Sequence, residues 1–183
     1  MTPTEELENL HAMIAHCTEC PLHATRTNAV PGEGAVDAKI MFVGEAPGAQ
    51  EDKLGRPFVG RSGELLTELI EGIGLTRKEV FITSVLKSRP PNNRTPKKSE
   101  IDACLPYLDR QLEIIDPELV VLLGGVAVSS LIGPWKMADA HGRFYDGNER
   151  TFFITYHPAA ALRFPSTREV ILADFEKLRA ELS

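Results

Sequence analysis

Residues 119–124, LVVLLG, form an unbroken apolar run that ends in glycine. A strand with apolar side chains on both faces is typical of a parallel sheet that helices cover on both sides. Other strand-like runs occur before and after it, and amphipathic segments with helical spacing separate them. This alternation predicts an α/β sandwich built on a parallel sheet. We expect strands at 39–44, 80–86, 119–124 and 151–157, and helices at 3–16, 62–73, 99–115, 125–133 and 166–182.

The overall composition indicates a single globular domain. The chain has 183 residues, of which 43% are hydrophobic and 25% charged, and this suits one domain over residues 1–183. No apolar run approaches the roughly 20 residues that span a bilayer, and the acidic N-terminus lacks the apolar core of a secretory signal. We therefore expect a cytoplasmic monomer with no membrane partner. The net charge of −6 argues weakly against a polyanion partner, but binding needs only a local basic patch.

Three polar loops rich in glycine and proline follow expected strands. They are GEAPG after the first strand, KSRPPNNR after the second and HPAA after the last. Sites in parallel α/β folds gather at the carboxyl ends of the strands, so these loops predict one site at one edge of the sheet. The first loop lacks the spacing of a phosphate-binding P-loop.

Each of these features also has an ordinary structural explanation. Residues 44–48 allow close approach of the backbone to a ligand, but they also suit a tight turn before a solvated acidic loop that includes Glu51. Phe58, within GRPFVGR, is either a core residue or a stacking surface for a flat ring. His157 is either structural or a hydrogen-bond donor, acid or base.

Positive charge is concentrated in residues 87–98, KSRPPNNRTPKK, which contain no acid. This pattern suits contacts with phosphates, and the alternative is a solvated basic loop. The cysteines number three, an odd count that fits a disulfide framework poorly. Cys17 and Cys20 form a C-x-x-C that suits a redox pair, a zinc half-site or an iron–sulfur half-site, and Cys104 is the third.

Five motifs together resemble one family. GEAPGAQED, GRPFVG, ITSVLKSRPPNNR, LVVLLG and HPAA occur in this order. Their order and spacing resemble those of the family 4 uracil-DNA glycosylases, the thermostable-type, iron–sulfur members of the uracil-DNA glycosylase superfamily. The resemblance implies a three-layer α/β/α sandwich with a central four-stranded parallel sheet. It also implies a monofunctional base-excision repair enzyme that hydrolyses the N-glycosidic bond of uracil flipped out of single- or double-stranded DNA.

The resemblance assigns roles to residues within these motifs. Glu45 would orient the attacking water or stabilise the cationic sugar, and His157 would donate a hydrogen bond to uracil O2 as negative charge develops there. Phe58 would stack on the base, and Leu162 to Phe164 would enter the duplex where the base departs. The other expected pocket residues are Gly44, Ala46, Gly48, Glu51 and Ser84, and the expected DNA contacts are Lys87, Arg89, Asn93, Arg94, Leu162 and Arg163.

Ser84 is the first of two departures from the family pattern. In the family the strand usually ends T-N-x-x-K-C-R-P-P, and the asparagine amide reads the uracil edge. A serine hydroxyl carries donor and acceptor on one shorter group, whereas an amide presents them separately. We therefore expect weaker discrimination for uracil, slower turnover or acceptance of other deaminated bases.

Ser88 is the second departure, at one of the family's four cluster cysteines. Cys17, Cys20 and Cys104 match the other three, and residues 17–20 and 88–104 would form the cluster-binding region. We expect a 4Fe-4S cluster whose fourth iron takes the Ser88 oxygen, another ligand or water. Oxygen is a harder donor than thiolate, so we expect a less stable cluster, and a 3Fe-4S form or no cluster are the alternatives.

Two other classes of protein are weighed against the glycosylase. One is a non-catalytic protein on the same fold that binds damaged or single-stranded DNA, which Ser84 favours and the presence of Glu45, Phe58 and His157 disfavours. The other is an iron–sulfur redox or sensor protein, in which the basic loop and HPAA would have no use. A contact with a replication clamp stays an open question, because the sequence does not identify one.

Overall fold

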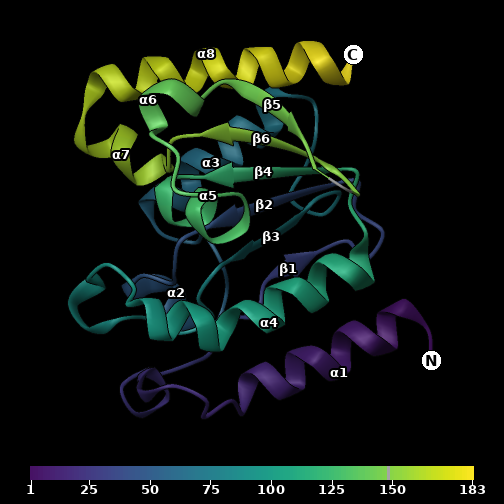
Figure 1. Ribbon diagram of the computed structural model, residues 1–183, viewed down its shortest axis with the longest axis vertical. Coiled ribbons are helices and arrows are strands. Elements are labelled where there is room, and N and C mark those ends of the chain that lie inside the picture. The colour runs from purple at the N-terminus through teal and green to yellow at the C-terminus, as the bar shows by residue number, and fades with distance from the viewer. Residues whose placement is uncertain (148) are drawn as a thin grey trace.

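Within residues 1–147 and 149–183, which the computed structural model describes, six strands form one sheet in the order β1-β3-β2-β4-β6-β5 (Figure 1). Neighbouring strands among β3, β2, β4 and β6 run parallel, whereas β1 and β5 pair antiparallel at the two edges. The predicted four-stranded parallel sheet is therefore confirmed at the centre, and the two edge strands are additions to it. The strands are β1 (Glu33–Gly34), β2 (Ile40–Gly44), β3 (Phe81–Ser84), β4 (Leu119–Leu123), β5 (Arg143–Asp146) and β6 (Thr151–Thr155).

Helices cover both faces of the sheet and give the predicted three layers. One face packs its apolar side chains against α3 and α8, and the other packs against α1, α4 and α5. Every residue of β4 is buried, as expected of a strand between two helical layers. The α-helices are α1 (Pro3–Ala15), α2 (Ala49–Leu54), α3 (Arg61–Gly72), α4 (Lys98–Ile115), α5 (Gly125–Leu131), α6 (Met137–Ala140), α7 (Pro158–Arg163) and α8 (Pro165–Leu182), and Pro21–Ala24 and Pro91–Asn93 are 3-10 turns.

The connections that follow the parallel strands lie at one edge of the molecule. Figure 1 shows α2, α7 and the loop before α4 together at the left of the view, where the strands β2, β6 and β3 lead. The terminal helices α1 and α8 lie at opposite ends of that view. None of the helices in the described residues is both long and apolar enough to cross a membrane.

Candidate functional site

A groove of about 650 Å³ lies where the loops after β2, β3 and β6 converge. The loop after β2 contributes residues 45–51, and the start of α3 contributes residues 60–62. The segment before α4 contributes Pro90, Asn93 and Arg94, and α7 with its flanks contributes residues 157–164 except Pro158 and Ala161. Segments far apart in the sequence thus form one concave surface at the carboxyl ends of parallel strands, where sites of α/β proteins are found.

His157 lines this groove as a neutral side chain. It is the N-cap of α7, and its Nδ1 accepts a hydrogen bond from the Ala159 amide at 3.0 Å. A nitrogen that accepts this bond carries no proton, so Nε2 carries the N–H. Burial lowers the pKa of His157 to about 4, and the negative charge of Glu51 opposes this shift. At neutral pH His157 is therefore a neutral donor rather than an acid with a full charge.

Glu45 lies in the same groove, directly after β2. Its backbone carbonyl accepts a hydrogen bond from Leu86 at 3.1 Å, which ties the loop to the end of β3. Burial raises the pKa of the Glu45 carboxyl. A partly desolvated carboxylate interacts more strongly with a positive charge or a water molecule than an exposed one does.

Phe58 lies behind the wall of the groove. Its side chain is only 6% exposed, and its ring lies 5.4 Å from the His157 ring at an interplanar angle of 25°. The ring also lies directly against Gly44, because a Cβ built there would be 2.6 Å from Phe58 Cζ. Gly44 pairs with Ser84 across β2 and β3, and that built Cβ would be 3.2 Å from Ser84 Oγ. Phe58, Gly44, Ser84 and His157 therefore form one packed group under the groove.

Glu51 lines the groove, but its carboxylate already binds backbone groups. Oε1 accepts from Gly48 N at 3.0 Å, and Oε2 accepts from Val59 N at 2.9 Å and Gly60 N at 2.8 Å. These three bonds join the loop after β2 to the segment that carries Phe58. Glu51, expected as a pocket residue, is held as a structural cross-link between two walls of the groove.

The rim of the groove carries apolar and cationic side chains. Leu162 is 38% exposed and Phe164 is 53% exposed, and the Arg163 guanidinium lies 5.6 Å from the centre of the Phe164 ring. Arg61, at the start of α3, also lines the groove. Arg61 was not among the predicted site residues, although its place in GRPFVGR, three positions after Phe58, was an available signal.

Comparisons with known proteins agree with this geometry. The model of the uracil DNA glycosylase superfamily matches residues 31–182. The chain belongs to this superfamily. It is 48% identical to the type-4 uracil-DNA glycosylase of Pyrobaculum aerophilum over 89% of this chain and 88% of that protein. It is 44% identical to the type-4 enzymes of Thermotoga maritima, over 98% and 96% of the two chains, and of Archaeoglobus fulgidus, over 95% and 92%. The predicted family is therefore confirmed.

The structure contradicts the role predicted for Lys87 of this glycosylase. We predicted a phosphate contact, but Lys87 is only 2% exposed. Its Nζ donates to Thr83 Oγ1 at 2.5 Å, the Ser84 carbonyl at 2.7 Å and Gln111 Oε1 at 2.8 Å. Burial lowers the pKa of Lys87 to about 7, and the Cys104 thiol acts in the opposite direction. Lys87 therefore supports the end of β3 from inside the protein.

The remaining residues of the basic segment differ in how they are held. Arg94 makes two hydrogen bonds of 2.8 Å to the carboxylate of Glu100, so much of its charge is already compensated. Arg89 Nε donates to Asn93 Oδ1 at 2.7 Å on the surface. Asn93 and Arg94 line the groove, whereas Arg89 lies beside it.

The cysteines of the glycosylase come together near the N-terminal end of α4. Burial raises the pKa of the Cys104 thiol, the nearby Lys87 lowers it, and Cys20 and Cys17 raise it further. Cys20 packs on the small apolar cluster that contains Cys104. In the described part of the chain no three His, Cys, Asp or Glu side chains are placed to hold a single metal ion. A cluster distributes its thiolates over several irons, so three neighbouring thiols fit its donor set better than they fit one ion.

Ser88 sits close to this thiol group but has a partner of its own. It is only 3% exposed, and its Oγ accepts a hydrogen bond from Arg26 Nη1 at 3.0 Å. The preceding amide, Lys87 N, donates to Cys104 Sγ at 3.5 Å. Ser88 is thus placed next to the expected cluster region, with its hydroxyl hydrogen-bonded to a cation.

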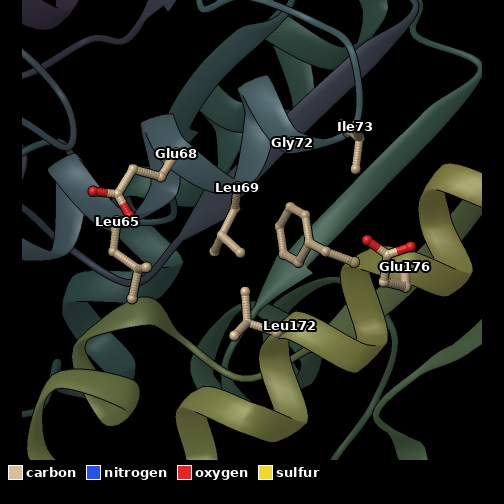
Figure 2. A pocket seen from close by; sticks show the side chains of 8 residues that line it. Leu65, Glu68, Leu69, Gly72, Ile73, Leu172 and Glu176 are labelled. Atoms are coloured by element: carbon tan, nitrogen blue, oxygen red, sulfur yellow. The ribbon is translucent and has the colours of Figure 1, made fainter.

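A separate apolar hollow of about 260 Å³ lies between α3 and α8 (Figure 2). Figure 2 shows Leu65, Leu69 and Leu172 pointing into it from the two helices, with Glu68 and Glu176 at its margins. It shares no residue with the groove. Its mainly apolar lining suits packing between the two helices.

Proposed function

We propose that this chain is a uracil-DNA glycosylase of base-excision repair, which hydrolyses the N-glycosidic bond of uracil flipped out of DNA. Its membership of the superfamily supports the reaction class. The observation that carries the proposal is that Glu45 and His157, the latter neutral with its proton on Nε2, line one groove. A base in duplex DNA must leave the stack before its glycosidic bond can be reached.

The proposed reaction uses the two residues for opposite charges. As the bond between uracil N1 and C1′ breaks, the electron pair goes to the base and negative charge develops on O2. His157 Nε2–H donates a hydrogen bond to this oxygen, and because the ring stays neutral it stabilises the anion without protonating it. The Glu45 carboxylate stabilises the positive sugar and orients the water that adds to C1′. The water's proton passes to Glu45 or solvent, leaving an abasic deoxyribose.

Phe58 is the proposed stacking surface for the base. The His157 and Phe58 rings are nearly parallel at a centroid distance of 5.4 Å, which is an offset arrangement. His157 therefore covers only part of the Phe58 face. A uracil over the remainder of that face places its O2 edge beside His157.

Ser84 is the proposed source of an altered base preference. Its carbonyl is bound by Lys87, so the hydroxyl is the group of this residue that can reach a base edge. A hydroxyl rotates between donor and acceptor roles and discriminates less than an amide. We expect wild type to excise hypoxanthine or xanthine measurably relative to uracil and Ser84→Asn to favour uracil more strongly. Equal rates and selectivity in the two proteins contradict this assignment.

DNA is the proposed partner, with the backbone held by the groove rim. Arg89, Asn93, Arg94 and Arg163 are the proposed phosphate contacts, and Leu162 with Phe164 is the proposed wedge where the base departs. The exposure of Leu162 and Phe164 beside the cationic Arg163 supports this role. A cytoplasmic, nucleoid-associated monomer remains our expectation.

A 4Fe-4S cluster is the proposed cofactor, held by Cys17, Cys20 and Cys104 with Ser88 or an exogenous fourth ligand. When bound, it would cross-link the segment after α1 to α4. Visible absorption and iron analysis of anaerobically prepared protein test it, with Ser88→Cys as the comparison. A folded, colourless and iron-free wild type contradicts the proposal.

The decisive experiment is a gel assay for abasic sites on single- and double-stranded DNA that carries one uracil. Wild type is expected to remove the uracil. His157→Asn and Glu45→Gln are each expected to lower the rate of removal by about 100-fold or more. The second candidate, a DNA-binding protein without excision, is favoured by Ser84 in place of the family asparagine. Tight binding of uracil-containing DNA with no abasic product would support that candidate and refute the enzyme.

A further inference from the structure

Phe58 adopts a backbone conformation that needs support. Its φ is +48°, in the left-handed region that residues other than glycine adopt uncommonly. Such a conformation persists where surrounding contacts over-determine it. The backbone of Phe58 also lies against the first turn of α3, because a Cβ built at Gly63 would be 2.0 Å from the Phe58 carbonyl carbon. The segment 57–60 is thus packed into one arrangement, and its hydrogen bonds show what holds it.

Arg77 binds two carbonyl groups of this segment. Its Nη1 donates to the Phe58 carbonyl at 2.8 Å and to Thr67 Oγ1 at 3.2 Å. Its Nη2 donates to the Pro57 carbonyl at 2.8 Å and to Glu33 Oε1 at 2.8 Å. The planar fork of an arginine can hold two successive carbonyls in this way, and a lysine ammonium cannot reproduce that geometry.

The two amides after Phe58 are held by a different side chain, Glu51. Val59 N and Gly60 N both donate to Glu51 Oε2, as described above. Arg77 and Glu51 therefore bind four backbone groups that belong to three consecutive peptide units, from Pro57 to Gly60. Arg77 does not line the groove, so its effect on the reaction is indirect, and its bonds to the Pro57 and Phe58 carbonyls provide a route through the Phe58 ring.

We propose that Arg77 is a positioning residue, which holds Phe58 in its left-handed conformation so that the ring is fixed for stacking on the flipped base. This inference rests on the proposed glycosylase function and on the stacking role of Phe58. Because Arg77 fixes the Phe58 ring before the base arrives, binding of the base does not have to supply the conformational entropy lost when the ring is ordered.

Arg56 provides a matched control. It binds the same carboxylate, with Nε and Nη2 donating to Glu33 at 2.9 and 2.8 Å, but within the described residues its side chain donates no hydrogen bond to the segment 57–60. Its side chain is 57% exposed, against 18% for Arg77. Arg77→Lys and Arg56→Lys are therefore the same chemical change beside the same partner, and each keeps a cation near Glu33.

Amide hydrogen exchange tests whether Arg77 holds the segment 57–60, and it requires neither DNA nor an activity assay. Arg77→Lys is expected to speed exchange at Val59 and Gly60 by about tenfold or more, because local opening of the segment becomes easier. Arg56→Lys is expected to leave both rates within about twofold, and thermal unfolding checks that both variants are folded. Unchanged exchange at Val59 and Gly60 in folded Arg77→Lys overturns the proposal. If Arg77→Lys does not fold, the same measurement is made on Arg77→Gln, with Arg56→Gln as its control.

A double-mutant cycle on single-turnover excision tests the link to the reaction. Arg77→Lys is expected to lower the rate about tenfold in wild type but less than about twofold in the Phe58→Ala background, since Arg77 acts through that ring. An equal loss in both backgrounds overturns the positioning role. If wild type excises no uracil while amide exchange responds as expected, the proposed function is wrong, but the role of Arg77 in holding the segment 57–60 is confirmed.

Discussion

Protonation of His157 is expected to make stability depend on pH in a way that one substitution removes. In the folded protein burial lowers the pKa of His157 from an ordinary value of 6.5 to about 4. Between these values the unfolded chain binds a proton that the folded protein does not, so the free energy of unfolding falls as the pH falls. At 1.36 kcal/mol per pKa unit, the whole pKa shift contributes about 3 kcal/mol to the free energy of unfolding at high pH. About 2 kcal/mol of this contribution is lost by pH 5. The contribution becomes constant about one pH unit above 6.5.

His157→Asn isolates this contribution, because asparagine is a good N-cap and does not titrate. Urea unfolding of both proteins, followed by circular dichroism from pH 7.5 to pH 5, gives the difference in stability. Between pH 7.5 and pH 5 we expect the free energy of unfolding of wild type to fall by about 2 kcal/mol more than that of His157→Asn. Burial and the charge of Lys87 also lower the pKa of His11 to about 4, but His11 is present in both proteins and cancels. A difference that does not change with pH would refute a buried, neutral His157.

Three further predictions concern other residues. Lys87→Met should leave the salt dependence of DNA binding unchanged, whereas Arg163→Ala should reduce the slope of log K against log salt by about 1, measured by fluorescence anisotropy. Because burial raises the pKa of Glu45, the excision rate should rise with pH through a value above 4.5, and Glu45→Gln should lack this acidic limb in single-turnover assays. Glu51→Gln should destabilise the protein by about 1–3 kcal/mol in urea unfolding, because Glu51 accepts three backbone hydrogen bonds, and a loss below the measurement error would contradict that role.

The central strands could be predicted from the sequence because runs of apolar residues indicate that they are buried. β4 is apolar along its whole length, and helical patterns separate it from its neighbours. The edge strands had no such signal. β1 has two residues, and β5 is partly exposed and mixes polar with aromatic side chains. Edge strands with one paired side need little apolar character, so composition does not reveal them.

Side-chain partners that come from distant elements could not be predicted. Lys87 lies in a run of cations that suggests solvent exposure, but one acceptor of its ammonium is Gln111, 24 positions away on α4. Arg77 appears as an ordinary charge between α3 and β3, and only the fold brings it to the carbonyls of Pro57 and Phe58. In both cases the local sequence suggests a surface cation, and the tertiary structure supplies enough acceptors to stabilise a buried lysine and a partly buried arginine.

Arg26 changes what the departure at Ser88 implies for the glycosylase. Its guanidinium donates to Ser88 Oγ at 3.0 Å and to the Ala15 carbonyl at 3.3 Å, so it joins the end of α1 to the loop after β3. Asp52 Oδ1 accepts from the amides of Thr27 and Asn28 at 2.8 and 3.3 Å, which fastens the next residues to α2. The segment between α1 and β1 is thus attached through contacts that involve no thiol. A cluster would add a second attachment through Cys17 and Cys20, and its loss would leave the first in place. The groove takes no side chain from residues 17–28, so loss of the cluster would act on its walls through the loop after Ser88, which supplies Pro90, Asn93 and Arg94.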